Sequence, residues 1–288
     1  EKIGPVVFKN NKIKGVVFTG SCETAKIIQN QLNQREEIVT LSAETGGQNF
    51  MIVDSSALTE QVVDDAIESG FNAAGQRCSA LRILAVQEEV YDKTIEMLIG
   101  ATNKIKVGMP HLIDTDIGPV IDIEAKDKIE NHLNKFKNKI LVKGNYDQNL
   151  NGYFVSPTVI EISNLNDIKE EIFGPVIHTY KYKSEEIEKL VEDINQMNYG
   201  LTLGIQSRIE NTINYIFHNA SIGNIYINRN ITGAVVGAQP FGGRGLSGTG
   251  PKAGGPNYLL KFVNEKTYSY DTTAAGGNAT LFMLSDNQ

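Results

Sequence analysis

The chain has 288 residues, of which 41% are hydrophobic and 21% are charged, and its formal net charge at pH 7 is −7. A chain of this length can bury a sizeable core in one domain or two, and its acidic balance argues against a sequence-wide nucleic-acid surface. Because no apolar run approaches the roughly 18 residues of a membrane span, we expect a globular protein without nucleic-acid or membrane contact from this portion.

Hydrophobic periodicity predicts strands and helices that alternate along the chain. Short runs rich in apolar residues predict strands at Gly15–Phe18, Ile38–Leu41, Asn49–Val53, Leu81–Val86, Ile177–Tyr182, Leu201–Ile205 and Asn224–Asn228. Longer stretches with helical spacing predict helices at Glu23–Gln31, Thr59–Ala74, Glu89–Ala101, Ile123–Lys137, Ser184–Met197 and Ile209–His218. This alternation is typical of crossover connections, so we predict an α/β fold.

Two segments carry weaker patterns. Asn138–Gly152 is rich in Asn and Lys and predicts a β-ribbon or a surface loop without chemistry of its own. Lys261–Gln288 begins with alternating apolar residues, which indicate a strand, and ends without a pattern.

Glu44 and Cys78 have surroundings that indicate chemistry. Glu44 follows an apolar stretch and precedes Gly46 and Gly47, so it lies where a strand gives way to a tight turn. A thiol attacks a carbonyl as thiolate, and a nearby carboxylate can take its proton or activate water. Alone, such a cysteine is more often a core residue and such a glutamate a solvated charge. Together they favour a nucleophile and a base.

A helix is predicted between these two residues. Thr59 is the expected N-cap, Gly75 ends the helix, and one face should be buried through Val63, Ile67, Phe71 and Ala74. Cys78 would then emerge on the loop after a helix that packs on the core. In that place its thiol could meet a substrate without any movement of the scaffold.

Several blocks in the same order resemble the aldehyde dehydrogenase superfamily, from about Gly15 to Gly255. The blocks are Val17–Ser21, Glu44 with its glycines, Gly75–Ser79, Glu170–Val176 and Pro240–Gly243 with Ser247–Gly248. The resemblance implies an α/β fold, with an aldehyde dehydrogenase-like catalytic domain and a remnant of the Rossmann-type cofactor domain. It also implies that Cys78 is the nucleophile, with its N–H as one oxyanion donor, and that Glu44 is the general base.

The same resemblance implies a site for NAD, or for NADP. Gly20 and Ser21 would lie at a strand-to-helix turn beside the cofactor pyrophosphate, where helix N–H groups suit an anion. Glu171 would bind the nicotinamide ribose, Phe173 would pack near the nicotinamide, and Phe241 belongs to the block that closes the substrate tunnel. The implied domains are a cofactor-domain remnant, a catalytic domain and a tail with an oligomerisation strand, at residues 1–46, 47–250 and 251–288.

A narrower resemblance points to the L-glutamate γ-semialdehyde dehydrogenases, also called Δ1-pyrroline-5-carboxylate dehydrogenases. It rests on Gly75–Arg82, Thr232–Gln239 and Ser247–Pro256. In that subfamily the equivalents of Ser79 and of the Gly233–Ala234 amides hold the substrate α-carboxylate, which such donors can bind without a buried counter-charge. The tail at 268–279 is similar to the dehydrogenase module of the bifunctional bacterial proline-utilization (PutA) proteins.

The beginning of the chain departs from the family pattern. Aldehyde dehydrogenases carry most of the dinucleotide-binding fold, and an oxyanion-hole asparagine, before the block that corresponds to Val17–Ser21. Here only 16 residues precede that block. We therefore expect a C-terminal portion whose N-terminal half is missing. This chain alone should bind NAD weakly or not at all and should not oxidise an aldehyde.

The cysteines and histidines bear on compartment and metals. Two cysteines cannot build a disulfide framework, and a nucleophilic Cys78 must stay reduced, so we expect a cytoplasmic protein. Cys22 is expected to pack or cap near a helix start. No metal site is expected, because the histidines lack metal-ligand spacing: His111, His132, His178 and His218.

The prediction is the catalytic portion of an NAD-dependent enzyme that oxidises L-glutamate γ-semialdehyde to L-glutamate in proline catabolism. Its partners would be a small aldehyde substrate and further copies of the chain, paired through the C-terminal strand. Three alternatives stay open: an inactive or assembly-only portion, a general aldehyde dehydrogenase, and a cofactor-free thiol hydrolase based on Cys78. The hydrolase is disfavoured because no Cys–His signature is recognisable.

Overall fold

The computed structural model describes residues 3–271 and residue 283. Within them the largest sheet has seven strands in the order β10-β9-β3-β4-β7-β6-β5. All neighbouring strands are parallel except β5 and β6, which are antiparallel. The strands span Asn49–Val53 (β3), Leu81–Gln87 (β4), Ile140–Lys143 (β5), Thr158–Ile162 (β6), Val176–Tyr182 (β7), Thr202–Gln206 (β9) and Asn224–Ile227 (β10).

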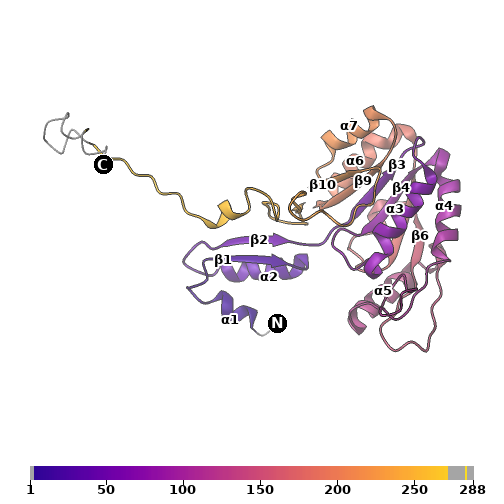
Figure 1. Cartoon of the computed structure of the whole chain (residues 1–288), viewed down its shortest axis with the longest axis horizontal. Helices are drawn as coiled ribbons and strands as arrows, with labels where there is room; N and C mark the ends of the chain where they lie inside the picture. The colour runs from indigo at the N-terminus through magenta and orange to yellow at the C-terminus, as the bar shows by residue number, and fades with distance from the viewer. Residues whose placement is uncertain (1–2, 272–282, 284–288) are drawn as a thin grey trace.

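Helices cover this sheet, and the core lies between the two (Figure 1). Every residue of β3, β4 and β9 is buried, as expected for central strands of a parallel sheet. The helices are α3 (Thr59–Phe71), α4 (Glu88–Thr102), α5 (Ile123–Lys135), α6 (Ile187–Gln196) and α7 (Glu210–Asn219). Short 3-10 turns span Asn72–Gly75, Lys137–Lys139, Leu165–Asp167, Ser184–Glu186 and Leu259–Phe262.

A small parallel sheet lies beside this body (Figure 1). It consists of β1 (Gly15–Thr19) and β2 (Thr40–Glu44), which the helix α2 (Cys22–Leu32) connects. A short helix, α1 (Gly4–Phe8), precedes β1. The chain returns to β2 late in the sequence, because Glu44 forms an antiparallel bridge with Gly248. A two-stranded ribbon, β8 (Tyr199–Gly200) with β11 (Arg244–Gly245), leads into that return.

The predicted α/β alternation is confirmed, with local corrections. Residues 38 and 39 lie outside any strand, and β2 begins at Thr40. Leu58, not Thr59, is the N-cap of α3, and no side-chain cap is present. The helix ends at Phe71 because the backbone of Ala73 and Ala74 turns left-handed at φ 55°. Its buried face also differs, since Val62 and Ala66 are fully buried whereas Ile67 is only half-buried.

The two weakly patterned segments have different outcomes. Residues 138–152 contain β5, which pairs antiparallel with β6. The sequence pattern did not predict β6. The described part of the C-terminal segment forms a 3-10 turn up to Phe262 and no strand over 263–271. The rest of the predicted oligomerisation segment, residues 272–282 and 284–288, lies outside the described residues.

The described residues lack two features, a membrane-spanning helix and a metal-binding cluster. No helix in residues 3–271 is both long enough and apolar enough to cross a lipid bilayer. The same residues contain no group of three or more His, Cys, Asp or Glu side chains that could hold a metal ion.

Candidate active site

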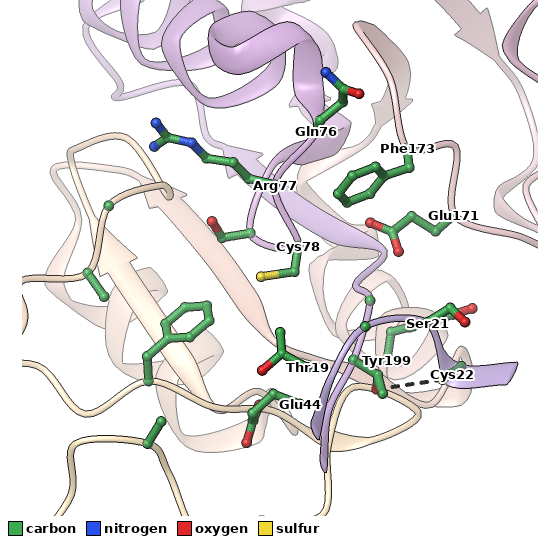
Figure 2. Close-up of a pocket in the computed structure, with 18 of the residues that line it drawn as sticks. Thr19, Ser21, Cys22, Glu44, Gln76, Arg77, Cys78, Glu171, Phe173 and Tyr199 are labelled. Atoms are coloured by element: carbon green, nitrogen blue, oxygen red, sulfur yellow. Dashed lines mark hydrogen bonds between the residues drawn. The ribbon is translucent and has the colours of Figure 1, made fainter. Parts of the chain in front are cut away.

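A cavity of about 1150 Å³ is lined by residues of both the small sheet and the large body. Every site residue predicted from the sequence lines it: Gly20, Ser21, Glu44, Cys78, Ser79, Glu171, Phe173, Gly233, Ala234 and Phe241. Figure 2 shows the Cys78 sulfur pointing into this space, with Glu171 and Phe173 on one flank. Segments far apart in the sequence therefore meet around one thiol.

Cys78 lies on a loop whose path is set by close backbone contacts. Gly75 has φ +64°, and a Cβ there would lie 2.1 Å from the Gly174 carbonyl oxygen, so the turn requires glycine. The buried Asn49 side chain, at the start of β3, donates to the carbonyls of Cys78 (2.7 Å) and Ala80 (2.9 Å). These bonds fix the loop to β3, one of the buried inner strands of the sheet.

The resting thiol is poorly ionised. Burial, and next the negative charge of Glu171, raise the pKa of Cys78 above its usual range, and Glu44 adds to the effect. The backbone N–H groups of Ser79 and Cys78 act in the opposite direction. A base must therefore take the proton before Cys78 can act as a nucleophile.

Glu44 ends β2 among close-packed glycines. Its Oε2 accepts from the Gly243 N–H at 2.9 Å, whereas its buried Oε1 has no hydrogen-bond partner. A Cβ on Gly242 would lie 2.6 Å from Oε1, and one on Gly248 would lie 2.9 Å from Oε2. Burial raises the pKa of Glu44 to about 7, despite the opposing effects of Gly243 and the nearby lysines. A carboxylate with a pKa close to neutral suits a general base.

Arg82 was not predicted, although it is the largest fully buried side chain. Its guanidinium donates to the carbonyls of Gly75 (2.8 Å), Arg77 (3.1 Å) and Gly174 (3.2 Å), and it pairs with Glu171 at 3.0 Å. It therefore joins the nucleophile loop to the Glu171 loop. The sign of this role in the sequence is an arginine inside an otherwise apolar strand. Hydrophobic periodicity alone does not assign a role to such a residue.

Glu171 and Phe173 form one wall of the cavity. The second Glu171 oxygen accepts from the Gly47 N–H at 3.2 Å, and a Cβ on Gly46 would lie only 1.9 Å from it. Burial raises the pKa of Glu171, and the Arg82 charge opposes that rise. Phe173 is 42% exposed, with its ring centroid 5.4 Å from the Arg82 guanidinium carbon.

The first turn of α2 borders the same cavity. Ser21 is the N-cap, and its hydroxyl accepts from the Thr24 N–H at 3.1 Å. Cys22 is the first helical residue; its thiol donates to the Leu246 carbonyl, and the side chain lines the cavity. A helix start of this kind favours a bound anion.

Ser79 and the loop around Gly233 form a further part of the cavity lining. Ser79 is buried, and its carbonyl accepts from the Thr202 hydroxyl at 3.3 Å. Gly233 has φ +74°, and a Cβ there would meet nothing within 4 Å, so the loop backbone is open to a ligand. Phe241 is held by two backbone hydrogen bonds with Ala253, at 3.0 and 2.8 Å.

Some lining residues were not singled out from the sequence. They are Thr19, Cys22, Glu23, Thr45, Gly46, Gln76, Arg77, Lys128, Glu170, Tyr199, Val236, Gly237, Gln239, Ala253 and Gly254. Several belong to motifs that had been recognised, such as Gln76 and Arg77 beside Cys78. Lys128 and Tyr199 come from α5 and β8, and no local pattern connects them with the site.

The aldehyde dehydrogenase family model matches residues 1–268. The chain belongs to this family. Among its relatives is the bifunctional protein PutA of Klebsiella aerogenes, which is 49% identical over 278 residues, or 92% of this chain and 21% of the relative. The 1-pyrroline-5-carboxylate dehydrogenase of Bacillus licheniformis is 36% identical over 93% of this chain and 53% of its own length. The predicted family and its PutA-like character are confirmed.

Solved structures support the aldehyde dehydrogenase fold. A crystal structure of a bifunctional PutA protein superposes with a TM-score of 0.91 at 48% identity, over 96% of this chain and 28% of that one. A Thermus 1-pyrroline-5-carboxylate dehydrogenase solved with bound NAD gives 0.83 at 32% identity, over 90% and 51%. The chain thus spans about a fifth of the PutA relatives and about half of the single dehydrogenases.

Proposed function

We propose that this chain is the catalytic portion of an NAD-dependent dehydrogenase that oxidises L-glutamate γ-semialdehyde to L-glutamate in proline catabolism. The observation that carries the proposal is the shared cavity, which places Cys78, Glu44, Ser79 and the Gly233 loop around one space. Its PutA and 1-pyrroline-5-carboxylate dehydrogenase relatives support this choice of substrate.

Cys78 is the proposed nucleophile. Its sulfur attacks the aldehyde carbon to give a thiohemiacetal, and the thiol proton passes to a base as the bond forms. The Cys78 N–H, which already lies close to the sulfur, can donate to the developing oxyanion. Oxidation then leaves a thioester on Cys78.

Glu44 is the proposed general base. In its present position it is held by the Gly243 N–H, and its pKa of about 7 keeps a large part of it ionised near neutral pH. The ionised carboxylate takes a proton from water, the water attacks the thioester, and Cys78 leaves as thiolate. The proton on Glu44 then returns to the Cys78 thiolate, which leaves free L-glutamate and the resting thiol.

The residues of one cavity wall fit a nicotinamide dinucleotide. The first turn of α2, after Gly20 and the N-cap Ser21, offers N–H groups for a pyrophosphate, whereas the Gly20 N–H itself donates to the Glu44 carbonyl at 3.1 Å. Glu171 presents a carboxylate that could accept from ribose hydroxyls. Phe173 offers an exposed ring face beside them. When bound, NAD supplies the hydride acceptor for the oxidation. Whether NAD or NADP is preferred depends on the adenosine end, beyond these residues.

Ser79 and the backbone around Gly233 and Ala234 are the proposed site for the substrate α-carboxylate. A hydroxyl and open backbone N–H groups bind a carboxylate well, and the positive φ of Gly233 lets the loop turn toward the cavity. A carboxylate held there selects an aldehyde whose two ends are a fixed distance apart. This selection separates the proposed function from that of a general aldehyde dehydrogenase.

Substitution of Ser79 tests this selection in the full-length gene product. We expect Ser79→Ala to lower kcat/KM for L-glutamate γ-semialdehyde roughly tenfold to a hundredfold, because a hydrogen bond to a charged group contributes about 1.5–3 kcal/mol. Propanal, which carries no carboxylate, should be affected much less. Equal losses for both substrates would mean that Ser79 only supports the Cys78 loop and that the enzyme is a general aldehyde dehydrogenase.

The remaining parts of the proposal concern the whole protein. We place the cofactor-domain remnant at residues 1–46, the catalytic domain at 47–250 and the tail at 251–288, and we infer a cytoplasmic homo-oligomer joined to an N-terminal half. An inactive or assembly-only portion would lack turnover even in the full-length gene product. A thiol hydrolase is less favoured, because no histidine among the described residues lines the cavity to pair with Cys78.

A further inference from the structure

Glu44 and Lys252 both lie next to Gly242. A Cβ on Gly242 would lie 2.6 Å from the Glu44 Oε1 and 3.1 Å from the Lys252 Cα. The buried Oε1 has no hydrogen-bond partner. In the described part of the chain, Lys252 forms no direct ion pair with a carboxylate. The Lys252 backbone thus lies close to a carboxylate with an unpaired oxygen, and the Lys252 ammonium acts on that carboxylate through its charge.

Neutral oxygens hold the Lys252 ammonium in place. Its Nζ donates to the Gly223 carbonyl and, at 3.1 Å, to the Asn224 Oδ1. The buried Asn224 also donates through Nδ2 to the carbonyls of Gly242 (3.0 Å) and Leu201 (2.9 Å). Lys252 and Asn224 therefore hold the turn at Gly242 and Gly243 in place. The Gly243 N–H in this turn donates to Glu44.

Other charged groups also face Glu44. Lys261, from the 3-10 turn at 259–262, donates to the Gly250 carbonyl at 2.6 Å and acts on Glu44 from the side of the C-terminal segment. Cys78 faces it across the cavity and would add a negative charge as thiolate. Lys252 exerts the stronger of the two lysine effects, and both lower the pKa of Glu44 against the effect of burial.

We propose that Lys252, braced by Asn224, is a positioning residue for the general base. It fixes the turn that holds Glu44 and supplies the positive charge that keeps the half-buried carboxylate ionised at neutral pH. Nothing in the proposed chemistry requires Lys252 to touch the substrate. The inference rests on the proposed role of Glu44 in thioester hydrolysis.

The test separates the effect of the Lys252 charge from the effect of its side-chain shape. It uses the full-length gene product. Lys252→Met keeps most of the side-chain length and removes the charge, whereas Lys252→Arg keeps the charge. Because an uncompensated carboxylate protonates more readily, we expect the acid limb of the kcat pH profile to move up by roughly one pH unit in Lys252→Met. On the acid side of the limb the rate should fall about tenfold, and Lys252→Arg should restore most of it.

A pre-steady-state experiment separates the hydrolysis step from acylation. In Lys252→Met the first-turnover burst of NADH should keep its amplitude, while the steady-state rate that follows falls as the pH drops. The control is Lys93→Met, which removes a positive charge from an exposed ion pair with Glu60 and should leave the profile unchanged. If Lys252→Met does not fold, Lys252→Gln removes the same charge and keeps hydrogen-bond donors.

Two results would overturn the inference. One is an acid limb that stays in place in the charge-removing variants. The other is an equal loss of rate in Lys252→Met and Lys252→Arg, which would show a structural role alone. A failure of the proposed function would be recognised separately, because the wild-type protein would then not oxidise L-glutamate γ-semialdehyde. The pH comparison would still be made on the hydrolysis of p-nitrophenyl acetate, because the proposed roles place its acetyl group on Cys78 and have Glu44 activate the water that releases it.

Discussion

At the scale of single residues, the acidity of the Cys78 thiol depends on its carboxylate neighbours. Burial and the charge of Glu171 raise its pKa, so little thiolate is present at neutral pH in the resting protein. Glu171 in turn is held by the buried Arg82 at 3.0 Å. The proposed nucleophile and the proposed ribose-binding carboxylate are therefore coupled through charge.

This coupling predicts the effect of Glu171→Gln on alkylation. Loss of the carboxylate charge lowers the pKa of Cys78, so the thiolate fraction at pH 8 rises and iodoacetamide should label Cys78 several-fold faster than in the wild type. The exposed Glu170 provides the matched control, since Glu170→Gln should leave the rate unchanged. Peptide mapping should locate the label on Cys78 rather than on Cys22. A label mainly on Cys22, or an unchanged rate in Glu171→Gln, would contradict this account.

Glu44 predicts a stability that depends on pH. Its pKa is about 7 in the folded protein and 4.5 as the ordinary value, so the folded state binds the proton more tightly. The contribution of Glu44 to the free energy of unfolding is thus fully present below about pH 4.5, and it is lost as the pH rises through 7. Glu44→Gln removes that loss, so we expect it to stabilise the protein at pH 8 by on the order of 1–3 kcal/mol.

The measurement is thermal unfolding of both proteins across pH. The apparent Tm of Glu44→Gln should exceed that of the wild type by a few degrees at pH 8, and the difference should shrink toward pH 5. A difference that is constant with pH would show that packing, rather than ionisation, distinguishes the two proteins.

The sequence located some of these residues and not others for a physical reason. Cys78, Glu44 and Glu171 stand in short motifs, so resemblance to the family was enough to single them out. Arg82, Asn49 and Lys252 act through backbone carbonyls supplied by distant segments. No local pattern encodes such partners, and only the folded chain shows them.

At the scale of elements, the turn after α3 sets the direction in which Cys78 points. Gly75 combines a left-handed backbone with a close approach to the Gly174 carbonyl, so Gly75→Ala should destabilise the protein by on the order of 3 kcal/mol. Gly100, in α4, has nothing within 4 Å of a Cβ position, and Gly100→Ala should stabilise by about 0.5–1 kcal/mol. Denaturant unfolding of the pair checks both signs. Equal effects would mean that the turn tolerates a side chain.

Periodicity predicted the central strands with small errors but gave no clear strand at the edge formed by β5 and β6. β3, β4 and β9 are buried throughout, so their apolar runs are unbroken and easily recognised. β5 has only four residues with partial exposure, and β6 contains the exposed Glu161, so neither has a run of comparable strength. The end of α3 was placed late because the residues at 72–75 continue the helical spacing while their backbone leaves it.

At the scale of the whole molecule, the cavity exists because the small sheet and the large body meet along it. Glu44 arrives from β2, Cys78 from the loop before β4, and the Gly233 loop from the segment after β10. The return of Gly248 to β2 holds these parts together. The predicted domain boundary near residue 46 stays a prediction, since the contacts here cross it.

The central claim is that Cys78 carries the acyl group and that Glu44 releases it. The most direct measurement uses Glu44→Gln in the full-length gene product, incubated with L-glutamate γ-semialdehyde and NAD, and then digested for peptide mass spectrometry. We predict a glutamyl thioester on the Cys78 peptide, an unmodified Cys22 and slow turnover after one equivalent of NADH. Turnover at the wild-type rate without an adduct, or an acyl group on Cys22, would contradict the account.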